Sequence, residues 1–507
     1  MPKSIAKDFF IWRFIGDKNS TKSEALNAYA QALRKSAKLK KAIRKKVGYL
    51  PKSQHQNRGK SKKDPKNFII YPKTASQKSL KHLKRLYRKI KRQGKYSDVL
   101  AMMTAPNPFE AFQDLPVTTQ CYIFNGVTFA YRKKRLNHHF SKEQLYFLAQ
   151  EPQFNQTLHS IITHKGLDKI KASLLYTPPI FDALSFGSRF LLAMNALKLD
   201  RPTKAIYYLN EAESRADYQS QRDQANFWLY LITQKQEYLT RLYQSNQVNL
   251  YTLRARDILG KEYPKVITPH LPVKLVADFD LHNPIDWEKI KRAIKEENST
   301  QIDQRANVFD SYHTEGVYSY LKEKASNYTK PYYAMPYMDA MLGKTKERTA
   351  LIYAIARQES RFVPASVSTS YALGMMQIMP FLIRHLAKEQ KEKLDLEEMF
   401  DPYVAIRYGD RHLDYLTKYL YHPLFIAYAY NGGIGFTRKI LTKRHLFEKG
   451  KYEPYLSMEL VEYEESKEYG KKVLANYVVY MNLLGKATKI TPLLETLTDP
   501  LETDKFR

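Results

Sequence analysis

A glutamate on the apolar face of a predicted helix is the first residue that could do acid–base chemistry. The segment LIYAIARQESRF, residues 351–362, carries Ile352, Ile355, Ala356 and Glu359 at intervals of three, one and three. This spacing puts the carboxyl group on the apolar face of an α-helix. Burial disfavours the charged form and raises a carboxyl pKa, as a general acid working near neutral pH requires.

The alternative for Glu359 is a structural ion pair with a basic neighbour, Arg357 or Arg361, at the helix end. A glutamate alone on such a face leaves this alternative open. Two further segments therefore bear on the choice.

The first is YALGMMQIMP, residues 371–380, which is rich in methionine. Methionines at this density usually fill a hydrophobic core. Gln377 is a neutral donor and acceptor among them, and a buried amide needs a polar partner. The second is IAYAYNGGIG, residues 426–435, in which Tyr430 and Asn431 precede glycines that end an apolar helix. A phosphate-binding loop is disfavoured there, because no strand precedes the glycines and the lysine and hydroxyl are misplaced.

The elements that must position these residues are predicted to be helices, giving an all-α fold of two or three packed units in 507 residues. No apolar run approaches the ~18 to 20 residues of a membrane span. Cys121 is the single cysteine, which excludes an intrachain disulfide and zinc sites with paired thiolates. Apolar residues at three-and-four spacing predict amphipathic helices over 79–92, 143–149, 190–197, 204–212, 224–233 and 238–244.

These helices indicate stacked helix pairs without a clean fixed repeat. Pro264, Pro269, Pro272 and Pro284 break any helix after Gly260. A helical linker is predicted to resume at Asp286, as an N-cap, and to end near Lys324, before a second break over residues 327–336. The predicted boundaries give domains at 1–259, 260–330 and 331–507.

The net charge of +32 is concentrated near the N-terminus. Residues 31–97 contain 24 lysines or arginines and one acid, Asp64. Such a block suits an anionic cell-wall or membrane surface, and nucleic acid is not the expected partner. A solvated helical surface is the simpler alternative. Residues 1–11 lack the apolar core of a secretory signal, so a signal for export would have to lie outside this chain.

Four motifs together resemble the soluble lytic transglycosylase family. RQESRF (357–362), GMMQIMP (374–380), AYNGG (429–433) and EESKEYGKKVL (464–474) occur in family order and at family spacing. The resemblance implies a superhelical, ring-like solenoid of helix pairs, a small linker domain and a C-terminal lysozyme-like domain. It also implies cleavage of peptidoglycan between N-acetylmuramic acid and N-acetylglucosamine, with a 1,6-anhydro product, in the periplasm.

The resemblance assigns roles residue by residue. Glu359 matches the sole catalytic carboxylate, and Tyr430 the tyrosine thought to assist the transition state. Ser368 matches a serine near the substrate's N-acetyl group, and Glu465 a carboxylate that lines the cleft. The other matches to substrate-binding positions are Ser360, Gln377, Met379, Asn431 and Tyr469. The implied mechanism uses the substrate's own acetamido group in place of a second carboxylate, so no metal or cofactor is expected.

Departures from the family pattern are modest. Met375 stands where leucine is usual, and Tyr371 where glycine is frequent, which is expected to reshape the cleft mouth. Phe381 and Leu382 replace small or polar residues. Two other functions stay open: a lysozyme- or chitinase-type hydrolase using water and a second acid, and a non-catalytic basic helical scaffold. The nearest candidates for a second acid are interpreted as helix caps or surface charges; they are Asp395, Asp401 and Asp410.

Overall fold

The computed structural model describes residues 3–50, 69–90, 94–444 and 446–507. Within these ranges every named element is a helix, and β-pairing is limited to isolated bridges. The prediction of an all-α fold is therefore confirmed.

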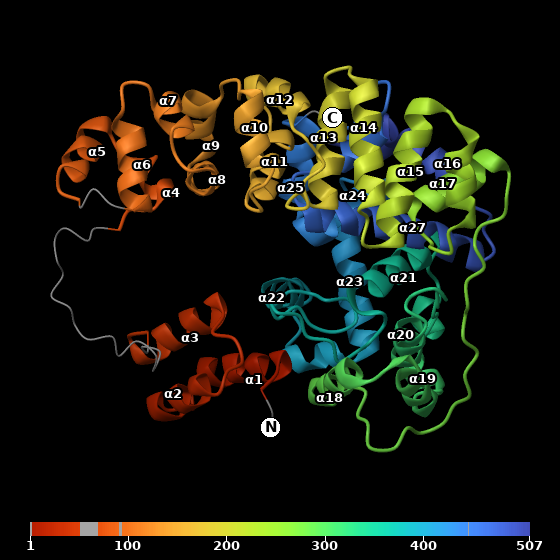
Figure 1. The fold of residues 1–507 in the computed structure, drawn as a ribbon. Coiled ribbons are helices and arrows are strands. Elements are labelled where there is room, and N and C mark those ends of the chain that lie inside the picture. Colours follow the sequence, from red (N-terminus) through yellow and green to blue (C-terminus); the bar gives the residue numbers. More distant parts are fainter. Residues whose placement is uncertain (1–2, 51–68, 91–93, 445) are drawn as a thin grey trace. The chain divides into compact units, whose positions relative to one another are not determined.

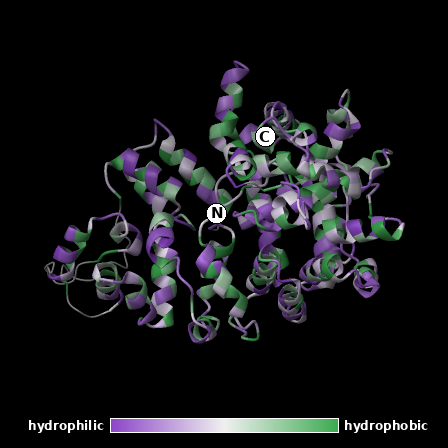
Figure 2. Ribbon diagram, turned by 90° about the horizontal axis from the view of Figure 1, so that it is seen from above, coloured by the Kyte–Doolittle hydropathy of each residue, from purple (hydrophilic) through white to green (hydrophobic). Residues whose placement is uncertain are grey.

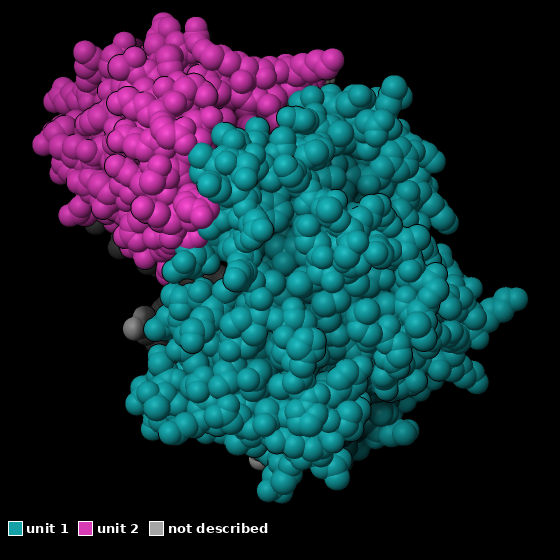
Figure 3. All heavy atoms as spheres, turned by 90° about the vertical axis from the view of Figure 1, so that its right-hand side faces the viewer, with its two compact units in different colours: residues 1–56, 246–438, 468–507 teal, residues 57–245, 439–467 magenta. Residues whose placement is uncertain are grey.

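Two compact units divide the chain, and Figure 3 shows them in different colours. Unit 1 comprises residues 1–56, 246–438 and 468–507, and unit 2 comprises residues 57–245 and 439–467. The predicted division into domains at 1–259, 260–330 and 331–507 stays a prediction.

The helices of unit 1 are α1 (Ile5–Gly16), α2 (Lys22–Ala30), α3 (Ala37–Val47), α17 (Leu250–Leu259), α18 (Pro284–Glu296), α19 (Ser299–Val308), η4 (Tyr312–Thr314), α20 (Glu315–Ala325), η5 (Met338–Met341), α21 (Lys346–Ser360), α22 (Pro380–Glu389), η6 (Leu396–Phe400), α23 (Pro402–Thr417), α24 (Pro423–Gly432), α28 (Ile490–Glu495), η7 (Thr496–Thr498) and α29 (Pro500–Thr503). Unit 2 holds α4 (Pro72–Ala75), α5 (Leu80–Tyr87), α6 (Lys95–Thr104), α7 (Pro108–Gln113), α8 (Val117–Gly126), α9 (Phe129–Tyr131), η2 (Arg132–Leu136), α10 (Lys142–Leu148), α11 (Phe154–Ile162), α12 (Asp168–Ser173), η3 (Leu174–Tyr176), α13 (Phe186–Lys198), α14 (Pro202–Ser214), α15 (Gln219–Thr233), α16 (Gln236–Gln244) and α26 (Tyr455–Glu459). Two helices, α25 (Ile434–Thr442) and α27 (Glu464–Leu483), have residues in both units.

Each amphipathic segment predicted in unit 2 contains a helix, from α5 to α16. Serine caps start several of them, as Ser141 does for α10 and Ser185 for α13, because a side-chain oxygen satisfies a free backbone N–H. Consecutive helices from α13 to α16 contact one another and lie side by side in Figure 1. The helix-pair interpretation fits this packing, while the superhelical ring stays a prediction.

The predicted boundary at Gly260 coincides with a helix end. The last residue of α17 is Leu259, and Gly260 takes the left-handed conformation that caps a helix, with φ +62°. The cap predicted at Asp286 is wrong. Asn283 caps α18 instead, accepting from the backbone N–H of Ile285, because Pro284 is already suited to the first helical position.

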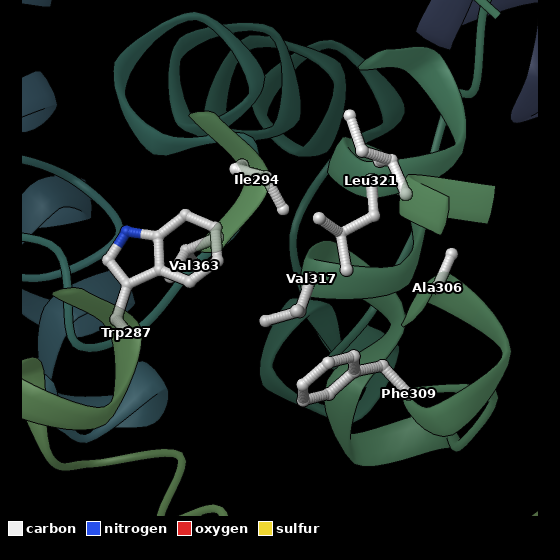
Figure 4. Packing of buried hydrophobic residues seen from close by; sticks show 8 residues of the cluster. Trp287, Ile294, Ala306, Phe309, Val317, Leu321 and Val363 are labelled. Atoms are coloured by element: carbon white, nitrogen blue, oxygen red, sulfur yellow. The ribbon is translucent and has the colours of Figure 1, made fainter. Parts of the chain in front are cut away.

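A hydrophobic core joins α18, α19 and α20 to the end of α21. Phe309, Val317, Leu321 and Trp287 are buried in one cluster. Val363, which follows the last residue of α21 by three, inserts into the same cluster (Figure 4). The chain shortly after Glu359 is therefore anchored by the burial of Val363 in this cluster.

Helices α1 and α3 pack against Tyr371 and its neighbour Ser370 in unit 1. The rings of Phe9 and Trp12 in α1 lie 6.1 and 5.6 Å from the Tyr371 ring, between centroids. The Lys38 ammonium in α3 donates to the carbonyl of Ser370 at 2.5 Å. The sequence analysis placed no helix at α1 or α2, so this docking was not anticipated.

Part of the predicted basic block lies outside the described residues, namely 51–68 and 91–93. The described remainder forms amphipathic helices such as α3, in which Leu39, Ile43 and Val47 are buried and the lysines are mainly exposed. Hydrophilic and hydrophobic residues likewise alternate along most helices in Figure 2. No described helix has the length and apolar character needed to cross a bilayer.

Replacing Phe309 with alanine should destabilise unit 1. The Phe309 side chain is only 2% exposed, and loss of a buried phenylalanine costs about 3 to 5 kcal/mol. Urea unfolding followed by circular dichroism should show a lower midpoint. The matched control is Val308→Ala at a side chain that is 57% exposed, which should move the midpoint little. Equal shifts in both variants would contradict the packing described for Phe309.

Candidate active site

Glu359 lies in the last turn of α21. Thr345 caps the start of this helix by accepting from the Arg348 N–H at 3.2 Å. Ile352 and Ile355 are fully buried, and Glu359 on the same face is partly buried at the helix end. The prediction that this carboxylate sits on the apolar face is confirmed.

A tyrosine hydroxyl bonds this carboxylate. Tyr469 in α27 donates to Oε1 of Glu359 at 2.8 Å, although the two residues are 110 positions apart. Tyr469 is 5% exposed. Burial raises the pKa of Tyr469 well above its usual value, and the negative charge of Glu359 raises it further. Tyr469 therefore stays a neutral hydrogen-bond donor.

The basic neighbours of Glu359 have a carboxylate partner elsewhere. Arg357 and Arg361 form salt bridges with Glu323 of α20, at 2.5 and 2.7 Å. Glu323 is 3% exposed and also accepts from the backbone N–H of Tyr332 at 3.0 Å. This buried network fixes the end of α21 against α20.

Close packing between α24 and α27 positions Tyr469. Gly470 follows it, and a Cβ atom at Gly470 would lie 2.2 Å from the ring of Tyr428 in α24. Only glycine allows the two helices this approach. The hydroxyl of Tyr469 can reach Glu359 because α27 lies in this position.

The segment between α21 and α22 is not helical. It folds back on itself through isolated bridges that pair Leu373 with Val367 and with Ile378. Gly374 has φ +74°, and a Cβ there would lie 2.0 Å from the carbonyl oxygen of Met399. This segment, residues 361–379, is here called the motif loop.

Two hydroxyl groups hold the motif loop beside Glu359. Ser360 donates through Oγ to the carbonyl of Met375 at 2.8 Å. Tyr430, near the end of α24, donates through Oη to the carbonyl of Met376 at 2.8 Å. Side chains from α21 and α24 thus meet at consecutive carbonyls of the loop.

Gln377 has the polar partners that the sequence analysis required. Its Nε2 donates to the carbonyls of Gly374 and Ser366, at 2.8 and 3.1 Å. Gln377 itself has φ +49°, a strained conformation for a residue with a side chain. These bonds stabilise the tight turn of the loop.

Tyr430 is partly buried at the end of α24. Burial, with a smaller contribution from the Glu359 charge, raises the pKa of Tyr430 well above its usual value. The ring of His412 in α23 lies 5.3 Å from the Tyr430 ring. Burial lowers the pKa of His412 to about 4, so His412 is neutral near pH 7.

The other residues matched to the family lie on these elements. Ser368 accepts through Oγ from the backbone N–H of Ala372 at 2.9 Å in the motif loop. Met379 directly precedes Pro380, the first residue of α22, and is partly buried. Asn431 is partly buried next to Tyr430. Glu465 is exposed in the first turn of α27, in a part of that helix that belongs to unit 2.

Tyr371 is buried, 1% exposed, beneath α1. Its φ of +61° costs about 1 kcal/mol or more for a residue other than glycine. Aromatic contacts with Phe9 and Trp12 offset this cost. The side chain therefore anchors the N-terminal helices to the motif loop.

The interpretation of the other nearby acids as caps or surface charges is confirmed for Asp395 and Asp401, whereas Asp410 is partly buried in ion pairs. Asp401 caps α23, and Asp395 caps the short helix η6 (Leu396–Phe400) and pairs with Arg13 at 2.5 Å. Asp410 forms salt bridges with Lys344 and Arg348. Among the described residues, no three His, Cys, Asp or Glu side chains are grouped to hold a metal ion.

Residues 336–452 match the family model described as the transglycosylase SLT domain. This segment is therefore similar to SLT domains. The soluble lytic murein transglycosylases of Salmonella typhimurium and Escherichia coli K12 are 30% identical over 136 residues and 31% identical over 135 residues. Each match covers 26% of this chain and 20% of the relative. The resemblance to the soluble lytic transglycosylase family is confirmed, over about a fifth of the length of these relatives.

Solved structures resemble the chain over a longer span. An inactive mutant of lytic transglycosylase Slt from Pseudomonas aeruginosa has a TM-score of 0.53 and 15% identity, covering 85% of this chain and 74% of that chain. The 70 kDa soluble lytic transglycosylase of Escherichia coli has a TM-score of 0.52 and 18% identity, covering 84% and 72%. These likenesses show a shared fold around and beyond the SLT domain.

Several residues that shape the SLT domain site were missed by sequence reasoning. His412, Glu323 and Trp12 carry no motif, and a helix pattern does not tell which distant helix each side chain meets. Gly470 lies in a quoted motif, but nothing in the sequence showed the contact that makes it necessary.

The variant Gly470→Ala should weaken both stability and activity. The added methyl group must displace Tyr428 or move α27, as overpacking by one carbon costs about 1 to 3 kcal/mol. Thermal unfolding would report the loss of stability. Gly435→Ala is the control, because a Cβ at Gly435 meets no atom within 4 Å. Unchanged stability of Gly470→Ala would refute the close approach of α24 and α27.

Proposed function

We propose that the protein is a lytic transglycosylase that cleaves the β-1,4 bond between N-acetylmuramic acid and N-acetylglucosamine in peptidoglycan. The observation that carries this proposal is the single carboxylate, Glu359, at the end of a buried helix with the Tyr469 hydroxyl bonded to it at 2.8 Å. The SLT domain and the printed names of its relatives support the substrate class.

Glu359 is proposed to begin the reaction as an acid. Its proton passes to the glycosidic oxygen, and the bond from that oxygen to C1 of the muramic acid breaks. Glu359 is left as a carboxylate. The Tyr469 hydroxyl donates to Oε1 and stabilises this charged form.

The substrate is proposed to supply the second group, as happens in substrate-assisted glycosidases. Its 2-acetamido oxygen attacks C1 as the leaving group departs. The C6 hydroxyl of the same sugar then attacks C1, the bond from C1 to the acetamido oxygen breaks, and Glu359 takes the proton of the hydroxyl. The product is 1,6-anhydro-N-acetylmuramic acid, and no water is consumed. Tyr430 is proposed to assist the transition state from α24.

Positions on and beside the motif loop are proposed to bind the glycan. Ser368 would lie near the N-acetyl group, with Gln377 and Met379 along the cleft. Ser360, Asn431 and Tyr469 complete the set close to Glu359, and Glu465 is proposed to place the sugar. The carbonyl contacts of Ser360 and Tyr430 support this assignment, since they fix the loop beside Glu359.

The proposed location is the periplasm, where this substrate is found. The basic residues between 31 and 97 would then favour contact with the anionic cell wall or a membrane surface.

The variant Glu359→Gln should lower the rate of peptidoglycan cleavage by about 10²- to 10⁴-fold, because an amide cannot donate and retrieve the proton. Purified sacculi are digested with each protein, and released muropeptides are identified by mass spectrometry. The control Glu389→Gln changes an exposed carboxylate of α22 and should retain full activity.

The same products separate the competing functions. Anhydro muropeptides support the lyase, whereas products heavier by one water molecule support a lysozyme-type hydrolase. Equal cleavage by wild type and Glu359→Gln would remove Glu359 from the mechanism. Absence of any cleavage by the wild type would favour the scaffold.

The variant Tyr469→Phe tests the hydrogen bond to Glu359. Without this donor the carboxylate is less stable, so Glu359 holds its proton to higher pH. The basic limb of the pH–rate profile should move upward by roughly one pH unit. Tyr477→Phe, about 12 Å further along the axis of α27, is the control and should leave the limb in place. A limb that moves to lower pH in Tyr469→Phe would contradict the proposed role.

A further inference from the structure

A basic pocket lies within unit 2, formed by two separate stretches of chain. The first stretch runs from the end of α11 through α12 to the last residue of α13. The second runs from α25 to the start of α27. The charged or titratable lining residues are His164, Lys165, Lys171, Lys198, Arg444 and Glu462.

Four cations and one carboxylate line this pocket, so its lining carries excess positive charge. The carboxylate, Glu462, is 5% exposed in its side chain and is already paired with Lys439 at 2.6 Å and with Arg444. Lys171 donates to the carbonyl of His164 at 2.5 Å. An ammonium has three donors, so a lysine bonded to one carbonyl can still donate to a bound anion.

The cations of the pocket act on one another. Burial lowers the pKa of Lys171 to about 8, and the neighbouring charges of Lys198 and Arg444 lower it further. Burial also lowers the pKa of Lys198, with Lys165 adding repulsion. Asp168 and Glu453 act in the opposite direction on these lysines, but less than burial does. A negative charge in the pocket would relieve this repulsion.

Apolar side chains complete the lining, among them Ile162, Ile440, Leu446 and Leu460. Lys171 and Arg444 are partly buried beside them, where an interaction with an anion is stronger than in open water, whereas Lys165 and Lys198 are exposed. Burial lowers the pKa of His164 to about 4, so its imidazole is neutral near pH 7 and adds no charge of its own. The lysines and Arg444 are therefore the recognition groups.

We propose that this pocket binds an oxyanion of the phosphate class with at least two negative charges, either free or as a phosphate ester. A guanidinium and several ammonium groups around one small space are suited to the tetrahedral oxygens of phosphate. A single carboxylate would leave most of the positive charge uncompensated. The proposal is independent of the cleavage reaction proposed for Glu359.

Bound phosphate would also link the two stretches of chain. Lys171 and Lys198 come from α12 and α13, while Arg444 follows α25. Phosphate bridging them should stabilise the folded unit, since a ligand that binds only the folded state raises its unfolding temperature.

The test is titration of the whole protein with inorganic phosphate, pyrophosphate and glycerol phosphate, followed by calorimetry and by thermal unfolding. Ionic strength is held constant with chloride. A parallel titration with acetate tests whether a carboxylate binds as well. Phosphate should bind saturably and raise the unfolding temperature. Stronger binding of pyrophosphate than of glycerol phosphate would indicate a free ion, and the reverse an ester.

Lys171→Met and Arg444→Met should each weaken phosphate binding by about tenfold or more, since a charge-assisted hydrogen bond is lost. Lys169→Met is the matched control, because Lys169 is an exposed lysine of the same helix, α12, outside the described lining. Lys165→Met removes a more exposed cation and serves if a buried variant does not fold. No saturable binding, equal binding in Lys165→Met and wild type, or acetate binding as tight as phosphate would overturn the proposal.

Discussion

The hydrogen bond from Tyr469 to Glu359 is the interaction on which the arrangement of the site depends. It joins the end of α21 to α27 across 110 residues of sequence, and its donor is almost fully buried. A partly buried carboxylate loses part of its hydration, and a hydrogen-bond donor offsets that loss. Tyr469 supplies that donor only because Gly470 lets α27 lie directly against Tyr428 in α24. The hydrogen bond from Tyr469 to Glu359 thus depends on how α21, α24 and α27 pack together.

The motif loop shows how a non-helical segment is held without a sheet. Its isolated bridges give little stability of their own, and Gln377 and Tyr371 both adopt left-handed backbone conformations. The compensating contacts come from outside the loop. Ser360 and Tyr430 bond consecutive carbonyls, and Trp12 packs on the ring of Tyr371. Strain is thereby concentrated beside Glu359 and balanced by the surrounding helices.

Residues distant in sequence serve the same unit. Helices α1 and α3 contribute to the surroundings of Tyr371. Helix α20 contributes Glu323, and α18 to α20 contribute the cluster that receives Val363. The chain after α24 instead passes into unit 2, where Arg444 and Glu462 line the basic pocket, before α27 brings Tyr469 back to unit 1. The second stretch of the proposed anion site therefore lies, in sequence, between Tyr430 and Tyr469 of the proposed catalytic site.

The sequence by itself determined the helical class, the helices α5, α10 and α13 to α16 of unit 2, and the residues that could do chemistry. Helical periodicity, prolines and caps are local, so the face that carries Glu359 and the end of α17 at Gly260 could be predicted. The sequence also predicted that the Gln377 amide needs polar partners, but it did not predict which groups these are. The prediction for the start of α18 is wrong, because Asn283 and not Asp286 caps this helix.

Only the tertiary structure decided which helices meet. A periodic pattern shows that a face is buried but not which surface covers it, so the pairing of Tyr469 with Glu359 and of Trp12 with Tyr371 could not be read from spacing. The same limit applies to charge. The sequence showed an excess of lysine and arginine, whereas the convergence of Lys171, Lys198 and Arg444 on one pocket depends on contacts between segments more than 200 residues apart. Such contacts are set by the packing of the whole unit, because burial depends on every surface that a helix face touches.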